Sequence, residues 1–228
     1  IDAARPYYEE ALSVFRDLGD EHGVASAVAN LGWADHYAGR NDAALDRLRT
    51  ALVVYRREDR HYNIAITLRG IALTEAESGA YADAVVHATE ALAILDLLGS
   101  RLSVAMALNC LGWAHFRSGH HDEAAAAYRR ALVVGEQAAS RHEMARAETG
   151  LGNVAAAQDR LAEAQRYWQR AEERGIELNT APAPVPRARG GGRTAGAAPG
   201  NPSERGHQPC PRPCSPPRPN RCPVRTAP

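Results

Sequence analysis

Residues 111–132 read LGWAHFRSGHHDEAAAAYRRAL, and residues 31–52, forty positions earlier, read LGWADHYAGRNDAALDRLRTAL. The two stretches share Leu-Gly-Trp-Ala at the start, a glycine in the middle and Ala-Leu at the end. The same spacing recurs along most of the chain at Leu31, Ile71, Leu111 and Leu151, and at Ala44, Ala84, Ala124 and Ala164. A repeat of this size is typical of a solenoid, in which small units bury their apolar faces against one another.

Each unit of forty residues predicts two antiparallel helices. In the first unit, apolar residues recur at helical spacing from Val24 to Leu31 and again from Leu45 to Leu52. A glycine lies between the two helices in the first three units, at Gly39, Gly79 and Gly119, and Asp159 takes this place in the last unit. Glycine is the residue that best adopts the left-handed conformation at a helix end. We expect helices roughly over 21–38 and 42–57. Gly32 and Gly112, one residue after the repeated leucine, would let the second helix approach closely.

The forty-residue register divides the chain. We expect a half repeat at 1–20, which is the second helix of a preceding unit, and a disordered tail at 180–228. Four full repeats lie between them, at 21–60, 61–100, 101–140 and 141–179. A chain that opens halfway through a repeat, without an initiator Met, is expected to come from something longer.

Composition separates the tail from the repeats. Residues 1–179 hold 19 Arg and 26 acidic residues, whereas residues 180–228 hold 8 Arg and one acidic residue; there is no lysine. Thirteen of the 14 prolines lie in the tail, which has too few apolar residues to fold. The sequence leaves open whether the tail is genuine or an out-of-frame translation, and a genuine tail could contact the acidic repeats. Its cysteines, Cys210, Cys214 and Cys222, do not have the paired spacing of a zinc site.

Several functional classes are disfavoured by the sequence. No apolar run reaches the roughly 20 residues of a membrane span. Cys110 is the only cysteine before the tail, which favours a reducing, cytoplasmic setting. No nucleotide-binding, nucleophile-elbow or zinc-protease motif occurs, so we expect neither an enzyme nor a cofactor or metal site. His115, His120 and His121 are interpreted as a solvated turn.

The repeated residues resemble the tetratricopeptide repeat (TPR) family. Its pattern is matched in the first unit by Leu31, Gly32, Gly39, Ala44, Leu48, Ala51 and Leu52, and in the third by their counterparts forty residues later. Two features depart from it. The common period is about 34 residues, and a position that is usually aromatic is here Asp35, Glu75, His115 and Ala155. The longer form is similar to the TPRs of kinesin light chains and of bacterial peptide-sensing regulators. The Ala- and Arg-rich composition of the repeats looks most like that of actinobacterial regulators, among them Streptomyces antibiotic regulatory proteins (SARP) and NTPase-type transcriptional regulators.

The resemblance implies an all-α, right-handed superhelix whose concave groove is lined by the first helix of each repeat. It places the following partner-binding residues in that groove: Asn30, Trp33, Tyr37, Arg69, Asn109, Trp113, Phe116, Arg117, Arg146 and Asn153. Asparagine can bond a peptide backbone, and the arginines could hold carboxylates. The alternatives are that the tryptophans mainly pack and that Arg69 and Arg146 form solvated or internal ion pairs.

We therefore expect a protein-interaction module that binds a peptide segment or domain in its groove, as part of a bacterial transcriptional or signalling regulator. One alternative is a free-standing adaptor or oligomerisation scaffold. Another is a switch that senses a peptide effector. The expected partner is a protein or peptide, with self-association possible, and without direct nucleic-acid contact by the repeats or membrane association.

Overall fold

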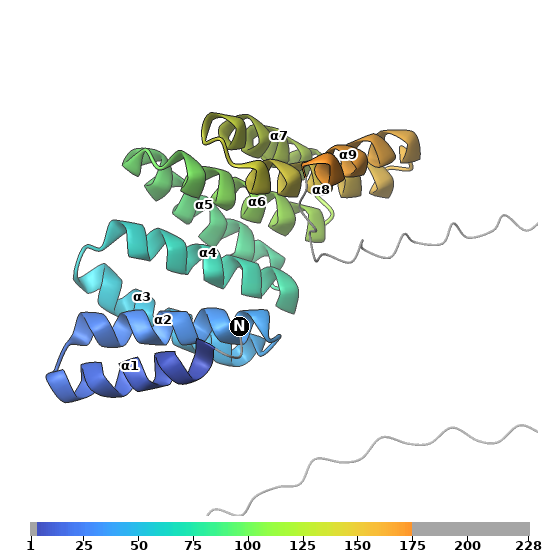
Figure 1. The fold of residues 1–228 in the computed structure, drawn as a ribbon. Helices are drawn as coiled ribbons and strands as arrows, with labels where there is room; N and C mark the ends of the chain where they lie inside the picture. Colours follow the sequence, from blue (N-terminus) through green and yellow to red (C-terminus); the bar gives the residue numbers. More distant parts are fainter. Residues whose placement is uncertain (1–3, 175–228) are drawn as a thin grey trace, which may run out of the picture. The chain divides into compact units, whose positions relative to one another are not determined.

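The computed structural model describes residues 4–174, and these form nine α-helices and no strand (Figure 1). The predicted all-α solenoid of helix pairs is confirmed. Each helix packs on the next one along the chain, and α4 also contacts α6, as α6 contacts α8. The predicted disordered tail, 180–228, lies outside the described residues. The helices are α1 (Arg5–Leu18), α2 (Glu21–Tyr37), α3 (Asn41–Arg57), α4 (His61–Ser78), α5 (Tyr81–Leu98), α6 (Arg101–Arg117), α7 (His121–Gln137), α8 (Arg141–Ala157) and α9 (Leu161–Glu173).

The turns between helices recur every twenty residues. Each contains one residue with a positive φ, and these residues are Gly19, Gly39, Asp59, Gly79, Gly99, Gly119, Ala139 and Asp159. Five are glycines, which adopt this conformation without a steric penalty. The helices α2, α4, α6 and α8 begin at 21, 61, 101 and 141, where the repeats were predicted to begin. The division into repeats stays a prediction, and the helix ends expected for the first repeat differ from the observed ones by one residue.

The second helix of a repeat inserts one side chain between two glycines. Leu48 of α3 lies against Gly32 of α2 and Gly70 of α4, where added Cβ atoms would come within 2.9 and 3.1 Å of it. Tyr128 of α7 lies in the same way between Gly112 of α6 and Gly150 of α8. We call each of these three-helix contacts a joint. The close approach expected at Gly32 and Gly112 is what the structure shows.

The joint of the second repeat is built from residues of intermediate size. Ala88 occupies the position of Leu48 and Tyr128, and its neighbours are Ala72 and Cys110 in one buried cluster. The two departures from the repeat pattern, Ala72 for glycine and Ala88 for a bulky residue, therefore compensate each other. Because interiors are close-packed, a smaller central side chain needs larger neighbours to fill the same space.

Buried carboxylates connect further helices. Asp35 is 1% exposed and contacts the guanidinium groups of Arg5, Arg40 and Arg47. Glu75, at the equivalent position of the next repeat, accepts from Arg49 Nη2 at 3.0 Å and lies 2.7 Å from His87 Nδ1. The hydrogen bond to Glu75 raises the pKa of His87 above its usual value. Buried charges are tolerated when they are paired. At two of the four positions where the family is usually aromatic, the chain thus forms ion pairs between neighbouring helices.

The joints predict an unusual response to a glycine-to-alanine change. Alanine normally stabilises a helix by about 1 kcal/mol relative to glycine. At Gly150 the new Cβ would lie 2.4 Å from the Tyr128 ring, so we expect Gly150→Ala to lower the free energy of unfolding by about 1–3 kcal/mol. Chemical denaturation followed by circular dichroism measures this value.

The matched control is Gly135→Ala. Its Cβ would meet the flexible Met144 side chain at 3.1 Å, so the variant should keep the wild-type stability or exceed it slightly. Equal effects of the two substitutions would contradict the joint as described.

Candidate functional site

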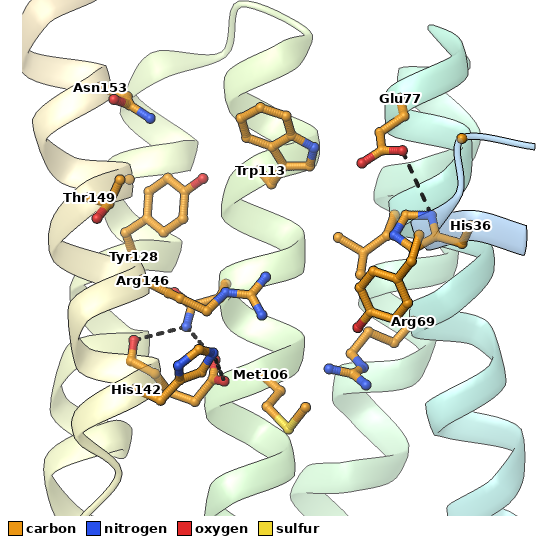
Figure 2. A pocket seen from close by; sticks show the side chains of 16 residues that line it. His36, Arg69, Glu77, Met106, Trp113, Tyr128, His142, Arg146, Thr149 and Asn153 are labelled. Atoms are coloured by element: carbon orange, nitrogen blue, oxygen red, sulfur yellow. Dashed lines mark hydrogen bonds and ion pairs between the residues drawn. The ribbon is translucent and has the colours of Figure 1, made fainter. Parts of the chain in front are cut away.

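A groove of about 740 Å³ crosses one face of the stack, along α2, α4, α6 and α8. The lining side chains come mainly from the first helix of each predicted repeat (Figure 2). Positions forty residues apart recur along it. These positions form four rows: Tyr37 with Glu77; Met106 with Arg146; Arg69 with Asn109 and Thr149; and Leu73 with Trp113 and Asn153. The repeat that builds the fold therefore also gathers distant side chains on one surface.

The groove brings together six of the ten residues predicted to bind a partner. They are Tyr37, Arg69, Asn109, Trp113, Arg146 and Asn153. Four predicted residues do not line it. Asn30 is exposed at the surface of α2. The other three support the groove from outside and are Trp33, Phe116 and Arg117.

The supporting residues hold groove residues in place. Phe116 stacks on Trp113 with ring centroids 6.0 Å apart. Arg117 lies 5.2 Å from the centroid of Trp113, and its Nη2 donates to the hydroxyl of Tyr81 at 3.4 Å. Trp113 is thus fixed on two sides while it lines the groove, which reduces the rotamer freedom that a partner would have to quench.

Both asparagines of the groove are already partly bonded. The Nδ2 of Asn109 donates to the backbone oxygen and to the carboxylate of Glu143, at 3.0 and 2.8 Å. Its Oδ1 is buried and has no hydrogen-bond partner among the described residues. The Oδ1 of Asn153 accepts from Trp168 Nε1 at 3.3 Å, which leaves its amide N–H groups for a partner. Asn153 therefore offers hydrogen-bond donors to a peptide, whereas the unpaired acceptor of Asn109 is buried.

Arg69 combines a charge with burial. Its side chain lies over the ring of Trp33, with Cζ 5.0 Å from the ring centroid, and only 8% of the residue is exposed. Its Nε has no hydrogen-bond partner among the described residues. Burial lowers the pKa of Arg69 below its usual value, and the neighbouring Arg146 lowers it further. The guanidinium remains charged at neutral pH because an arginine starts from a pKa above 12.

A polar cluster closes one end of the groove. His36 Nδ1 lies 3.0 Å from Thr74 Oγ1 and 3.7 Å from Glu77 Oε2. Burial, and then the charge of Arg69, lower the pKa of His36, while burial raises the pKa of Glu77. Both shifts favour the neutral forms, so His36 is uncharged at neutral pH and bonds through its ring nitrogen.

Several lining residues were not predicted from the sequence, and for two of them a signal was available. Glu77 is forty residues from both Tyr37 and Arg117, and that spacing could have identified it. Tyr128 comes from α7, a second helix, and reaches the groove because Gly112 and Gly150 leave space for its ring. Two small residues opposite one large side chain were the signal available for Tyr128.

Within residues 4–174, no cluster of three or more His, Cys, Asp or Glu side chains could hold a metal ion. The thiol of Cys110 is buried, and burial raises its pKa to about 12, so it does not act as a nucleophile at neutral pH. No helix among the same residues is long and apolar enough to cross a membrane.

His36 predicts a dependence of stability on pH. Because its pKa is lower in the folded than in the unfolded chain, its contribution is fully present above the unfolded value of 6.5 and is lost as the pH falls through the folded value. We expect acidification from about pH 7 to about pH 5 to lower the melting temperature of the wild type more than that of His36→Asn, whose amide retains a bond to Thr74. His61→Asn, at an exposed position, is the control and should follow the wild type. If the melting temperatures of all three proteins fell equally with pH, the lowered pKa of His36 would be contradicted.

Comparisons with known proteins agree with this fold. The family model described as tetratricopeptide repeat matches residues 1–57 and 63–137, which is more than half of the chain. No curated protein matches the sequence.

The solved structures that are similar include the following three, all at sequence identities that show the fold alone. Aspartyl phosphate phosphatase F from Bacillus subtilis has a TM-score of 0.66 at 15% identity, over 75% of this chain and 45% of that one. A Rap protein complexed with competence and sporulation factor has a TM-score of 0.67 at 18% identity, over 75% and 49%. BtubC (BKLC) from P. vanneervenii has a TM-score of 0.65 at 20% identity, over 86% and 81%.

This chain matches a little less than half the length of the phosphatase and Rap chains. The family match, the forty-residue register and the stacked helix pairs lead to one conclusion: the chain belongs to the tetratricopeptide repeat family.

Proposed function

We propose that the groove along α2, α4, α6 and α8 binds a peptide segment of a partner protein, and that the chain acts as a protein-interaction module. The observation that carries this proposal is the composition of the groove, in which Trp113 and two arginines lie among the apolar side chains of Leu73 and Met106. Tryptophan and arginine contribute most to binding energy at protein interfaces.

The size of the groove favours a short segment over a whole domain. A volume of about 740 Å³ falls in the range that accommodates a few side chains, about 300–1,000 Å³. The polar atoms of the groove are distributed among apolar ones, and the amide of Asn153 offers N–H groups to a peptide carbonyl. An extended peptide presents both side chains and unpaired carbonyls to such a surface, and a helical one presents a face of side chains.

The wider role that we propose is in a bacterial transcriptional or signalling regulator. The fold similarity to a Rap protein crystallised with competence and sporulation factor supports a setting in which such repeats meet a peptide. Reading the gene upstream of the codon for Ile1 tests this role. An open frame that encodes a DNA-binding or nucleotide-binding domain would support it, and a nearby start codon would favour the free-standing adaptor.

The groove is tested by selecting peptides from a displayed random library on the full chain. We expect peptides that bind the wild type and lose at least about thirtyfold in affinity on the double variant Trp113→Leu/Arg146→Met, since two central contacts are removed. Fluorescence anisotropy with the synthetic peptide measures the loss.

The control variant, Tyr62→Leu/Arg129→Met, removes an aromatic and an arginine side chain that do not line the groove, and it should bind as the wild type does. Unchanged binding by the groove variant, or a library that yields no binder, would overturn the proposed function. Circular dichroism of both variants shows whether the fold is retained.

A further inference from the structure

The outward side of α5 is apolar although it is exposed. Val86 is 62% exposed and Leu97 is 90% exposed, the highest fraction among the large apolar side chains of residues 4–174. The hydroxyl of Thr89 donates to the backbone oxygen of Val85 at 2.7 Å, so its polar atom is already satisfied. The side of α5 that faces the stack is apolar as well, a pattern typical of a helix covered on both sides. We call the exposed row along this helix the α5 stripe, and it consists of Ala82, Val86, Thr89, Ala93 and Leu97.

The neighbouring second helices have no such stripe. The positions forty residues before it, on α3, are Asp42, Asp46, Arg49, Val53 and Arg57. The positions forty residues after it, on α7, are Asp122, Ala126, Arg129, Val133 and Gln137. Charged and polar residues thus occupy these positions in the first and third repeats, as expected where a helix faces water. The apolar stripe is therefore particular to α5 and is not a general feature of the repeat.

Ion pairs border the stripe on both sides. Arg56 Nη2 of α3 donates to Glu90 of α5 at 2.7 Å, and Arg130 Nη2 of α7 donates to Asp96 of α5 at 2.8 Å. An exposed apolar patch with a polar rim is typical of a protein-interaction surface. No residue of α5 lines the groove, so the stripe is a separate surface.

We propose that the α5 stripe packs against the α5 stripe of a second copy of this chain, so that two copies associate and leave both grooves open. Ala82, Val86, Thr89 and Ala93 are spaced by four, three and four residues. This spacing is that of the core positions of a two-stranded coiled coil. The inference does not depend on the proposed function of the groove.

A parallel pairing makes the flanking helices complementary. A two-fold axis parallel to α5 places α3 of one copy against α7 of the other, and positions forty residues apart then lie at the same height. Val53 faces Val133 of the second copy, and Arg56 faces Glu136 of the second copy; all four positions are exposed. Each of these contacts occurs twice in the dimer, because the symmetry repeats it.

The remaining charges favour the same orientation. Arg49 and Arg129 would share a height, but Arg49 Nη2 already donates to the buried Glu75 of its own chain at 3.0 Å. An antiparallel pairing would instead place α7 against α7, with Glu123 of each copy near Glu136 of the other. Like charges at an interface are unfavourable.

The C-terminal segment of this chain is poorly suited to cover the stripe. Residues 180–228 contain no Leu, Ile, Met, Phe, Tyr or Trp. Such a segment cannot bury Val86 and Leu97 against large apolar side chains, whereas a second copy of α5 supplies these side chains in matching positions.

The first experiment measures the mass of the full chain by sedimentation equilibrium over a range of concentrations. We expect the wild type to pass from the mass of one chain to that of two. Val86→Glu/Leu97→Glu should raise the dissociation constant of the dimer at least about a hundredfold, because four carboxylates would be buried without partners. The matched control, Val14→Glu/Leu161→Glu, makes the same substitutions at exposed positions of α1 and α9 and should associate as the wild type does.

The second experiment tests the parallel orientation with exchanged charges. Arg56→Glu and Glu136→Arg should each weaken the dimer at least about tenfold, because each makes like charges face one another twice. An equimolar mixture of the two variants should regain the wild-type affinity. In the mixed dimer the two introduced charges face each other, and so do the two native ones.

Several outcomes would overturn the inference. A wild type that stays monomeric at every concentration would do so, as would a dimer that the stripe variant leaves intact or that the control weakens equally. A mixture no tighter than its two components would overturn the parallel pairing. Circular dichroism spectra that match the wild type would show that each variant retains its fold.

Discussion

The close fit of one side chain between two repeats is the constraint on which the rest of the structure depends. At each joint a residue of the second helix fills a gap between two first helices, as Leu48 does between Gly32 and Gly70. Because no repeat can bury its apolar face alone, the joints determine how closely α2, α4, α6 and α8 approach one another. The spacing of those four helices in turn fixes the width of the groove.

This packing explains both the regular rows of side chains in the groove and the residues that depart from them. Side chains forty residues apart line up because the helices that carry them are stacked in register, as with Leu73 and Trp113. Tyr128 appears among them because it is larger than Leu48 and passes the glycines on either side. The same stacking buries Arg69 against Trp33 of the preceding repeat. The guanidinium of Arg69, which would be solvated on an isolated helix, is thus buried and held in one orientation.

The sequence predicted the fold well because the fold is determined locally. Helix ends in the first repeat were placed within one residue, since glycines and apolar spacing act over a few residues. The groove was harder to predict. Arg69 and Arg146 depend only on helix phase and were identified, whereas the Asn109–Glu143 bond joins residues 34 apart. The three arginines around Asp35 come from α1, from the turn after α2 and from α3, so nothing in their spacing shows that they meet.

The sizes of the side chains at the joints also limit how the array can evolve. Leu48 requires a glycine at the position of Gly70, whereas Ala88 is matched to Cys110, and Tyr128 to Gly150. Deleting the second repeat would bring Leu48 against Cys110, which is too large, and deleting the third would leave Ala88 facing Gly150 across a void. The repeats therefore have a fixed order. Although they look like interchangeable modules, recombination that loses, duplicates or shuffles one of them must also change the residue it meets in the next.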